Sequence, residues 1–97
     1  MKFNKKKSII KNVKFGKNVT IIEPVNLYGC KISDGCLIGP FVEIQDNVEI
    51  GKNSRVQSHT FICSKVKIEA NCFIGHGVLF TNDKFSNCIT ERTKKNE

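Results

Sequence analysis

From residue 32 to residue 80 an apolar residue stands at every sixth position without exception: Ile32, Ile38, Ile44, Ile50, Val56, Ile62, Ile68, Ile74 and Phe80. The residue four positions after each of the first eight is small: Cys36, Val42, Val48, Ser54, Thr60, Val66, Cys72 and Val78. A large and a small side chain two positions apart point to the same face of a strand, so each hexad suits one short strand and one turn. Three hexads then predict a triangular coil whose large side chains stack along its axis.

The turn chemistry agrees with this period. The last position of each predicted turn needs a positive φ, and several of these positions hold residue types that tolerate it: Gly35, Asn47, Asn53, Asn71 and Gly77. A β-sandwich or barrel would place its turns every eight to twelve residues, which is too wide a spacing for this chain. The sequence therefore predicts an all-β fold, a single-stranded parallel β-helix.

The same period extends toward the N-terminus through Phe15, Ile21 and Leu27, which are paired with the smaller Val13, Val19 and Val25. One residue is missing from the period within the segment LYGCKI. We predict about four coils in a domain that spans residues 13–83. A basic lead-in, residues 1–12, precedes it, and a polar and basic tail, residues 84–97, is expected to be disordered or irregular.

The charge balance, 16 Lys and Arg against 9 Asp and Glu, leaves the chain at +7 and suits an anionic ligand. Nucleic acid is not the expected ligand, because the later basic residues alternate with acidic ones and no aromatic stacking platform is evident. The phosphates of a nucleotide or of coenzyme A fit equally well. The basic N-terminus lacks the apolar run of a signal peptide and no stretch could span a membrane, so we expect a cytoplasmic protein without a membrane partner.

The cysteines are odd in number: Cys30, Cys36, Cys63, Cys72 and Cys88. They form no CxxC pair, so the sequence indicates neither a disulfide framework nor a zinc knuckle. Cys36 and Cys72 fall at interior positions and are expected to be small fillers of the core. We expect reduced thiols and no bound metal.

The outward residues differ between the three predicted faces. Glu49 and Lys67 stack as an opposite-charge pair on one face, as expected for a solvated surface. The other two faces carry apolar side chains: Phe61, Cys63 and Leu79 on one, Leu37 and Phe73 on the other. Such side chains favour burial against another copy of the chain.

The two histidines fall at the corner between these apolar faces. His59 and His76 are 17 residues apart, one less than a coil, so they are predicted at the same corner in successive coils. A cleft there would also contain Gln57, Ser58 and Gly77, and Asn82 and Asp83 would follow one corner further along. Alternatively, His59 only fills a left-handed turn position, for which His is enriched, and His76 is only solvent-exposed.

The segments VNLYGCKI, VQSHTFIC and CFIGHGVLFTND resemble the hexapeptide-repeat acyltransferases, and among them the N-acetyltransferases that act on nucleotide-linked amino sugars for surface polysaccharide assembly. The similarity covers roughly residues 13–83. It implies a left-handed β-helix, an exception to the right-handed rule for parallel crossovers. It also implies a homotrimer whose subunits meet through the faces that bear Phe61, Leu79, Leu37 and Phe73.

The activity that the resemblance implies is transfer of an acetyl group from acetyl-coenzyme A to the amine of a dTDP- or UDP-linked amino sugar, between subunits. His59 would be the general base, and His76 would hold the sugar or act as the alternative base. Gln57, Ser58, Asn82 and Asp83 would bind the substrate, while Gly75 and Gly77 would contact coenzyme A. The leaving thiolate is a further acceptor for the proton, in which case both histidines only bind.

Two other functions are compatible with this fold. The chain ends soon after FTND, whereas relatives continue with further coils along which coenzyme A lies, so a truncated, non-catalytic trimeric fragment or assembly module is the alternative function. A γ-type carbonic anhydrase has the same fold, but it binds zinc through three histidines and this chain has two.

Overall fold

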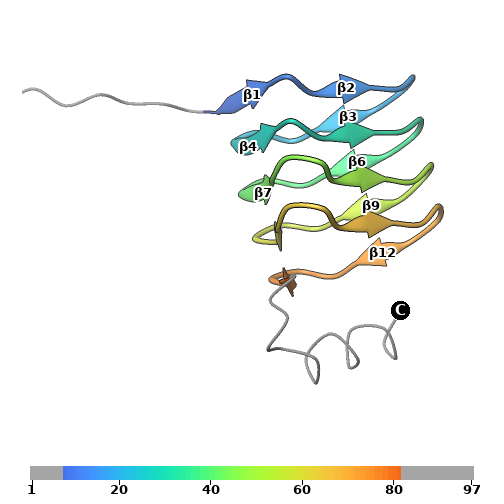
Figure 1. The fold of residues 1–97 in the computed structure, drawn as a ribbon. Coiled ribbons are helices and arrows are strands. Elements are labelled where there is room, and N and C mark those ends of the chain that lie inside the picture. The colour runs from blue at the N-terminus through green and yellow to red at the C-terminus, as the bar shows by residue number, and fades with distance from the viewer. Residues whose placement is uncertain (1–7, 82–97) are drawn as a thin grey trace, which may run out of the picture.

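The computed structural model describes residues 8–81, which form a β-solenoid of four complete coils followed by the first strand of a fifth (Figure 1). All thirteen elements of this range are strands of two to four residues, and it contains no helix, so none that could cross a membrane. The all-β fold and the number of coils predicted from the hexads are confirmed.

The strands build three parallel sheets, one on each side of the coil, and we name them A, B and C. Sheet A contains β1 (Ile9–Lys11), β4 (Val25–Tyr28), β7 (Val42–Ile44), β10 (Phe61–Ile62) and β13 (Leu79–Phe80). Sheet B contains β2 (Lys14–Phe15), β5 (Lys31–Ile32), β8 (Glu49–Ile50) and β11 (Lys67–Ile68). Sheet C contains β3 (Thr20–Ile21), β6 (Leu37–Ile38), β9 (Arg55–Val56) and β12 (Phe73–Ile74).

The coils wind in the left-handed sense. In Figure 1 the chain descends from the blue end, the strands of sheet B run to the right in front, and the paler strands of sheet C run to the left behind them. Seen from the N-terminal end, the chain therefore turns anticlockwise as it recedes. This is the exception to the usual right-handed crossover that the family resemblance implies.

The residues of the six-residue period lie one above another inside the prism. Ile38 pairs with Val56 and Val56 pairs with Ile74 along sheet C, and the exposed fractions of these side chains are 0%, 0% and 7%. Ile32, Ile44, Ile50 and Ile62 are likewise fully buried in the same core. The predicted stacking of the large apolar residues is confirmed.

Small interior positions also accept polar residues, because each finds a carbonyl in the next coil. The hydroxyl of Ser54 donates to the Glu69 carbonyl at 2.8 Å, and that of Thr60 donates to the Gly75 carbonyl at 3.1 Å. The Cys36 thiol donates to the Gly51 carbonyl at 3.1 Å. These buried groups are thus satisfied, as a stable core requires.

Four cysteines lie in the described range, and all are free thiols: Cys30, Cys36, Cys63 and Cys72. Burial raises the pKa of the Cys30 thiol to about 11 and also raises the pKa of Cys36. Both thiols therefore stay protonated and unreactive at neutral pH, in line with a role as core fillers. Cys63, predicted to point outward, is buried but lies outside the main core cluster.

Corner residues take the left-handed conformation that the sequence predicts. Gly35, Asn47, Asn53, Asn71 and Gly77 all have positive φ values, between 58° and 72°. His59 also adopts this conformation, as its alternative interpretation predicts, and so do Phe41 and Lys65, which the turn chemistry does not single out. Phe41 and His59 belong to one corner, described below.

The first coils are shorter than the later ones. Strand partners differ by 17 residues between β1 and β4 and between β4 and β7, and by 18 between β5 and β8. The missing residue of LYGCKI therefore lies at the corner that follows β4. The solenoid also begins earlier than residue 13, since β1 (Ile9–Lys11) lies within the predicted lead-in and pairs with β4.

Candidate functional site

The corner that joins sheet C to sheet A brings the two histidines together. Its four turns connect β3 to β4, β6 to β7, β9 to β10 and β12 to β13, and we call it the C–A corner. His59 lies in the third turn and His76 in the fourth. The structure thus places both imidazoles at one edge of the prism in successive coils, as the 17-residue spacing predicts.

His76 is held through its ring by the coil above. Its Nδ1 lies 2.8 Å from the Ser58 hydroxyl oxygen. Backbone spacing supports this contact, because the Gly77 amide donates to the Ser58 carbonyl at 2.9 Å. With Nδ1 engaged by Ser58, Nε2 is the ring nitrogen left to meet a ligand, and the ring itself is exposed.

His59 stacks on an aromatic ring of the coil above it. The centroids of the Phe41 and His59 rings are 4.9 Å apart, and the ring planes differ by 25°. Both residues have left-handed backbones, with φ of 60° at Phe41 and 62° at His59. His59 therefore does fill a left-handed turn position, and the side chain it presents there is exposed and held by a ring contact.

A left-handed backbone at Phe41 is unusual, since bulky residues rarely adopt positive φ. Strained conformations of this kind tend to occur where the surrounding structure serves a function. The Phe41 amide donates to the Pro24 carbonyl at 2.6 Å, and Pro24 follows a cis peptide bond. The corner therefore stacks Pro24, Phe41, His59 and Gly77 in one column.

The other predicted site residues divide into three groups. Gln57 and Ser58 are half-buried at the C–A corner, next to His59. Gly75 and Gly77 lie in the fourth turn of that corner, and a Cβ atom built on either would meet no atom within 4 Å. Asn82 and Asp83 lie outside the described residues.

The apolar outward residues are unevenly covered. Leu79 and Phe73 are 59% and 68% exposed, while Phe61 and Leu37 are half-buried. On sheet A the outward residues in register with Phe61 and Leu79 are Ile9, Asn26 and Glu43, so the first coil and the later coils are apolar and the two coils between them are polar. Sheet B is polar, with Glu49 paired to Lys67 in register.

Within the described part of the chain, no group of three or more His, Cys, Asp or Glu side chains is placed to hold a metal ion. The chemistry of the C–A corner is instead that of two imidazoles, a hydroxyl and an amide. Imidazole accepts and returns protons near neutral pH, and the hydroxyl and amide orient ligands by hydrogen bonds. Such a corner suits proton transfer coupled to the transfer of a group between two bound molecules.

Comparison with known protein families finds a match for the six-residue repeat. Residues 29–64 match the family model of the bacterial transferase hexapeptide (six repeats). The matched range runs from the corner after β4 to the corner after β10, and it includes His59 and Ser58. The match therefore identifies hexapeptide repeats in the middle coils of the solenoid.

A solved structure has the same fold. It is the crystal structure of a protein from Bacillus cereus described as a candidate acetyltransferase, with a TM-score of 0.58 and 22% sequence identity. The alignment covers 84% of this chain and 56% of the Bacillus cereus chain, so this chain spans little more than half the length of that neighbour. Among curated proteins, none matches this chain significantly.

Sequence reasoning missed Phe41 as a site residue, together with Pro24, Asn26 and Glu43 beside it. These residues line a hollow next to His59, described below. A signal for them was present, because the coil length places residue 41 directly above residue 59. The hexad pattern marks position 41 only as a turn, and Phe is not a residue type that a left-handed turn favours.

Proposed function

We propose that this protein transfers an acetyl group from acetyl-coenzyme A to the amine of a nucleotide-linked amino sugar used in surface polysaccharide assembly. The observation that carries the proposal is the arrangement of the C–A corner. There His59 and His76 lie in successive coils, and Ser58 forms a hydrogen bond with the His76 ring. The hexapeptide match and the fold of the Bacillus cereus protein support it. A reaction that uses acetyl-coenzyme A would take place in the cytoplasm.

The chemistry asks little of the protein. The neutral amine attacks the thioester carbon, a C–N bond forms, the C–S bond breaks, and coenzyme A leaves as a thiolate. One proton must move from the amine nitrogen to the thiolate. The protein contributes orientation of both substrates, hydrogen bonds to the developing oxyanion, and a carrier for that proton.

In this proposal His59 accepts the proton from the amine and later delivers it to the thiolate. His76 holds the sugar through Nε2, since its Nδ1 is engaged by Ser58, and it is the alternative base. Gln57 and Ser58 bind the substrate from the same corner, and Asn82 and Asp83 hydrogen-bond the sugar or its amine. Gly75 and Gly77 leave room against which coenzyme A would pack.

The proposed active assembly is a homotrimer. Sheets A and C flank the C–A corner, and both carry outward apolar side chains, Phe61 and Leu79 on one and Leu37 and Phe73 on the other. Covering these faces with a second copy would remove apolar surface from water and turn the open corner into a cleft between subunits. Association would also stabilise a solenoid of this length by mass action.

Phe61→Asp is expected to abolish the trimer, because it places an unpaired charge in the middle of the proposed interface. Light scattering coupled to size exclusion measures the mass of the assembly. Lys67→Asp is the matched control, since it also introduces an Asp at an outward strand position, but on the polar sheet B. A Phe61→Asp protein that stays trimeric would show that sheet A is not the interface.

Acetyl-coenzyme A binding tests the proposed function directly. We expect titration calorimetry to give a dissociation constant between about 1 μM and 1 mM, the range of ordinary enzyme substrates. Addition of a dTDP- or UDP-linked amino sugar should then release free coenzyme A thiol and one equivalent of N-acetyl sugar. Absence of binding at millimolar acetyl-coenzyme A would remove the transferase function for this chain and leave a non-catalytic assembly module as its role.

A further inference from the structure

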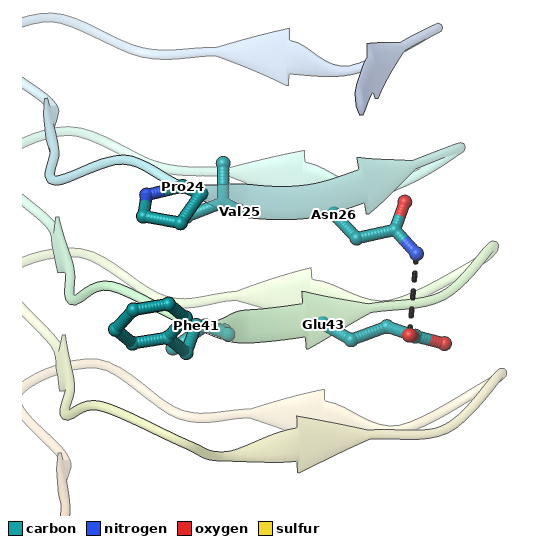
Figure 2. Close-up of a pocket in the computed structure, with 6 residues that line it drawn as sticks. Pro24, Val25, Asn26, Phe41 and Glu43 are labelled. Atoms are coloured by element: carbon teal, nitrogen blue, oxygen red, sulfur yellow. Dashed lines mark hydrogen bonds between the residues drawn. The ribbon is translucent and has the colours of Figure 1, made fainter. Parts of the chain in front are cut away.

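A hollow of about 250 Å³ opens on sheet A beside the C–A corner (Figure 2). It is lined by six residues of two successive coils: Pro24, Val25, Asn26, Phe41, Val42 and Glu43. Figure 2 shows Pro24 above Phe41 at one end and Asn26 above Glu43 at the other. The hollow therefore has an apolar end at the corner and a polar end on the strands.

Glu43 provides the charge in this hollow. One carboxylate oxygen accepts a hydrogen bond from the Asn26 amide, and the other accepts one from the Gln45 amide, both at 3.2 Å. These two bonds fix the half-buried carboxylate without neutralising it, because neither comes from a lysine or arginine. Among residues 8–81, both hydrogen-bond partners of this carboxylate are neutral amides, so its charge is available for a cation from outside.

Phe41 provides a flat apolar surface at the other end. Its side chain is 58% exposed, although its ring also stacks on His59. A left-handed Phe backbone is disfavoured, so the fold holds an aromatic ring at a position where Gly or Asn would cost less. An exposed ring of this kind can pack against the C–H face of a saturated ring.

The hollow lies next to the coil that carries His59. Phe41 lies directly above His59, and Glu43 pairs with Phe61 on the next strand of sheet A. Strand geometry, with about 3.3 Å per residue and about 4.8 Å between strands, then separates positions 43 and 59 by roughly 8 Å. A small group lying between them would be within contact distance of both side chains.

From this arrangement we infer that the hollow binds a protonated primary amine carried on a saturated ring, with the ammonium on Glu43 and the ring face on Phe41. The inference rests on the proposed function only for its catalytic consequence, which is that Glu43 delivers the amine to His59. The ammonium first gives one proton to water, and the neutral amine that remains is the nucleophile. His59 is then free to accept the second nitrogen proton as the C–N bond forms. Glu43 is then a substrate-binding residue that selects amines.

This selection distinguishes the amine substrate from the corresponding hydroxyl compound and from the acetylated product. A hydroxyl in place of the amine offers Glu43 no positive charge, and the amide of the acetylated product is also neutral. Either molecule could still donate a hydrogen bond to the carboxylate, but it would lose the attraction between opposite charges, so both molecules should bind more weakly than the amine. Weaker binding of the product would favour its release after acetyl transfer.

The test uses three sugars of nearly the same shape: D-glucosamine, D-glucose and N-acetyl-D-glucosamine. On titration with glucosamine we expect the NMR signals of the Asn26 and Gln45 side-chain amides to shift with saturation in the millimolar range. Glucose and N-acetylglucosamine should shift them at least tenfold more weakly. Equal responses to all three sugars, or no response to glucosamine, would overturn the inference.

Glu43→Gln separates the role of the charge from that of the fold. Gln is isosteric with Glu and keeps the chain length, and Glu49→Gln is the control because Glu49 is an exposed carboxylate on sheet B. We expect glucosamine affinity to fall at least tenfold in Glu43→Gln and to stay unchanged in Glu49→Gln, with equal thermal melting of both variants. An unchanged affinity in Glu43→Gln would contradict the assignment.

Steady-state kinetics distinguish this inference from the proposed function. If the wild-type protein transfers acetyl groups and Glu43→Gln raises KM for the amino sugar at least tenfold, both stand. If transfer occurs and KM is unchanged, the transferase stands and the amine site is wrong. If glucosamine binds through Glu43 but no acetyl transfer is detected, the amine site stands and the transferase is wrong.

Discussion

Val56→Asp is expected to unfold the solenoid. Val56 is fully buried on β9 between Ile38 of the coil above and Ile74 of the coil below, so an Asp there has no water and no cation in reach. Burying an unpaired carboxylate costs several kcal/mol, and a native domain is stable by only about 5–15 kcal/mol in total. Circular dichroism during denaturant titration should show loss of the folded state under conditions where the wild-type protein is folded.

Arg55→Asp is the matched control for this experiment. Arg55 precedes Val56 on β9 and is exposed, so the same new side chain then stays in water and should change stability by less than about 0.5 kcal/mol. The difference in stability between the two variants tests whether position 56 of β9 points inward and position 55 points outward. If Val56→Asp were as stable as Arg55→Asp, position 56 would not lie on the axis of the coil.

The hexad period could predict this alternation because each strand is fixed by the same two constraints. A large residue such as Ile44 or Ile62 fills the axis, and a left-handed Gly or Asn such as Asn53 turns the corner. Both constraints are local, repeat every six residues and need no knowledge of distant contacts. The strand pairing then follows, because three turns return the chain above itself.

The first coil was harder to predict because its period is broken. Between Ile10 and Val13 there are two residues, as between Leu27 and Cys30, where later coils have three. The shortened corner shifts Ile10 out of the hexad register, so β1 fell within the predicted basic lead-in. Phe15 follows the period, but its side chain is 44% exposed in the first described coil.

Only part of the candidate site could be predicted from the sequence. Spacing alone brought His59 and His76 to one corner, because only the coil length is needed for that. The contact of the Phe41 ring with His59 depends on side-chain conformation, and so do the hydrogen bonds that Glu43 accepts from two side-chain amides. A sequence period does not fix side-chain conformation. Hence the imidazoles were predicted, and the hollow beside them was not.

Loss of the imidazole at position 59 is expected to lower the turnover number of acetyl transfer by about a hundredfold or more, the usual effect of removing a general base. His59→Ala makes this change, but Ala is strained at the φ of 62° that position 59 adopts. His59→Asn is the sharper variant, because Asn tolerates the left-handed backbone and cannot carry the proton. KM for both substrates should change much less than turnover, since the base acts in the transition state.

Added imidazole provides a second measurement for the role of His59. If the lost group is the proton carrier, millimolar imidazole should restore part of the turnover of His59→Asn and leave the wild-type rate unchanged. His76→Asn is the companion variant, for which we expect a higher KM for the sugar, because His76 is held by Ser58 and presents Nε2 to the ligand. If the two variants exchange these effects, His76 is the base. If neither lowers turnover, the leaving thiolate takes the proton and both histidines only bind.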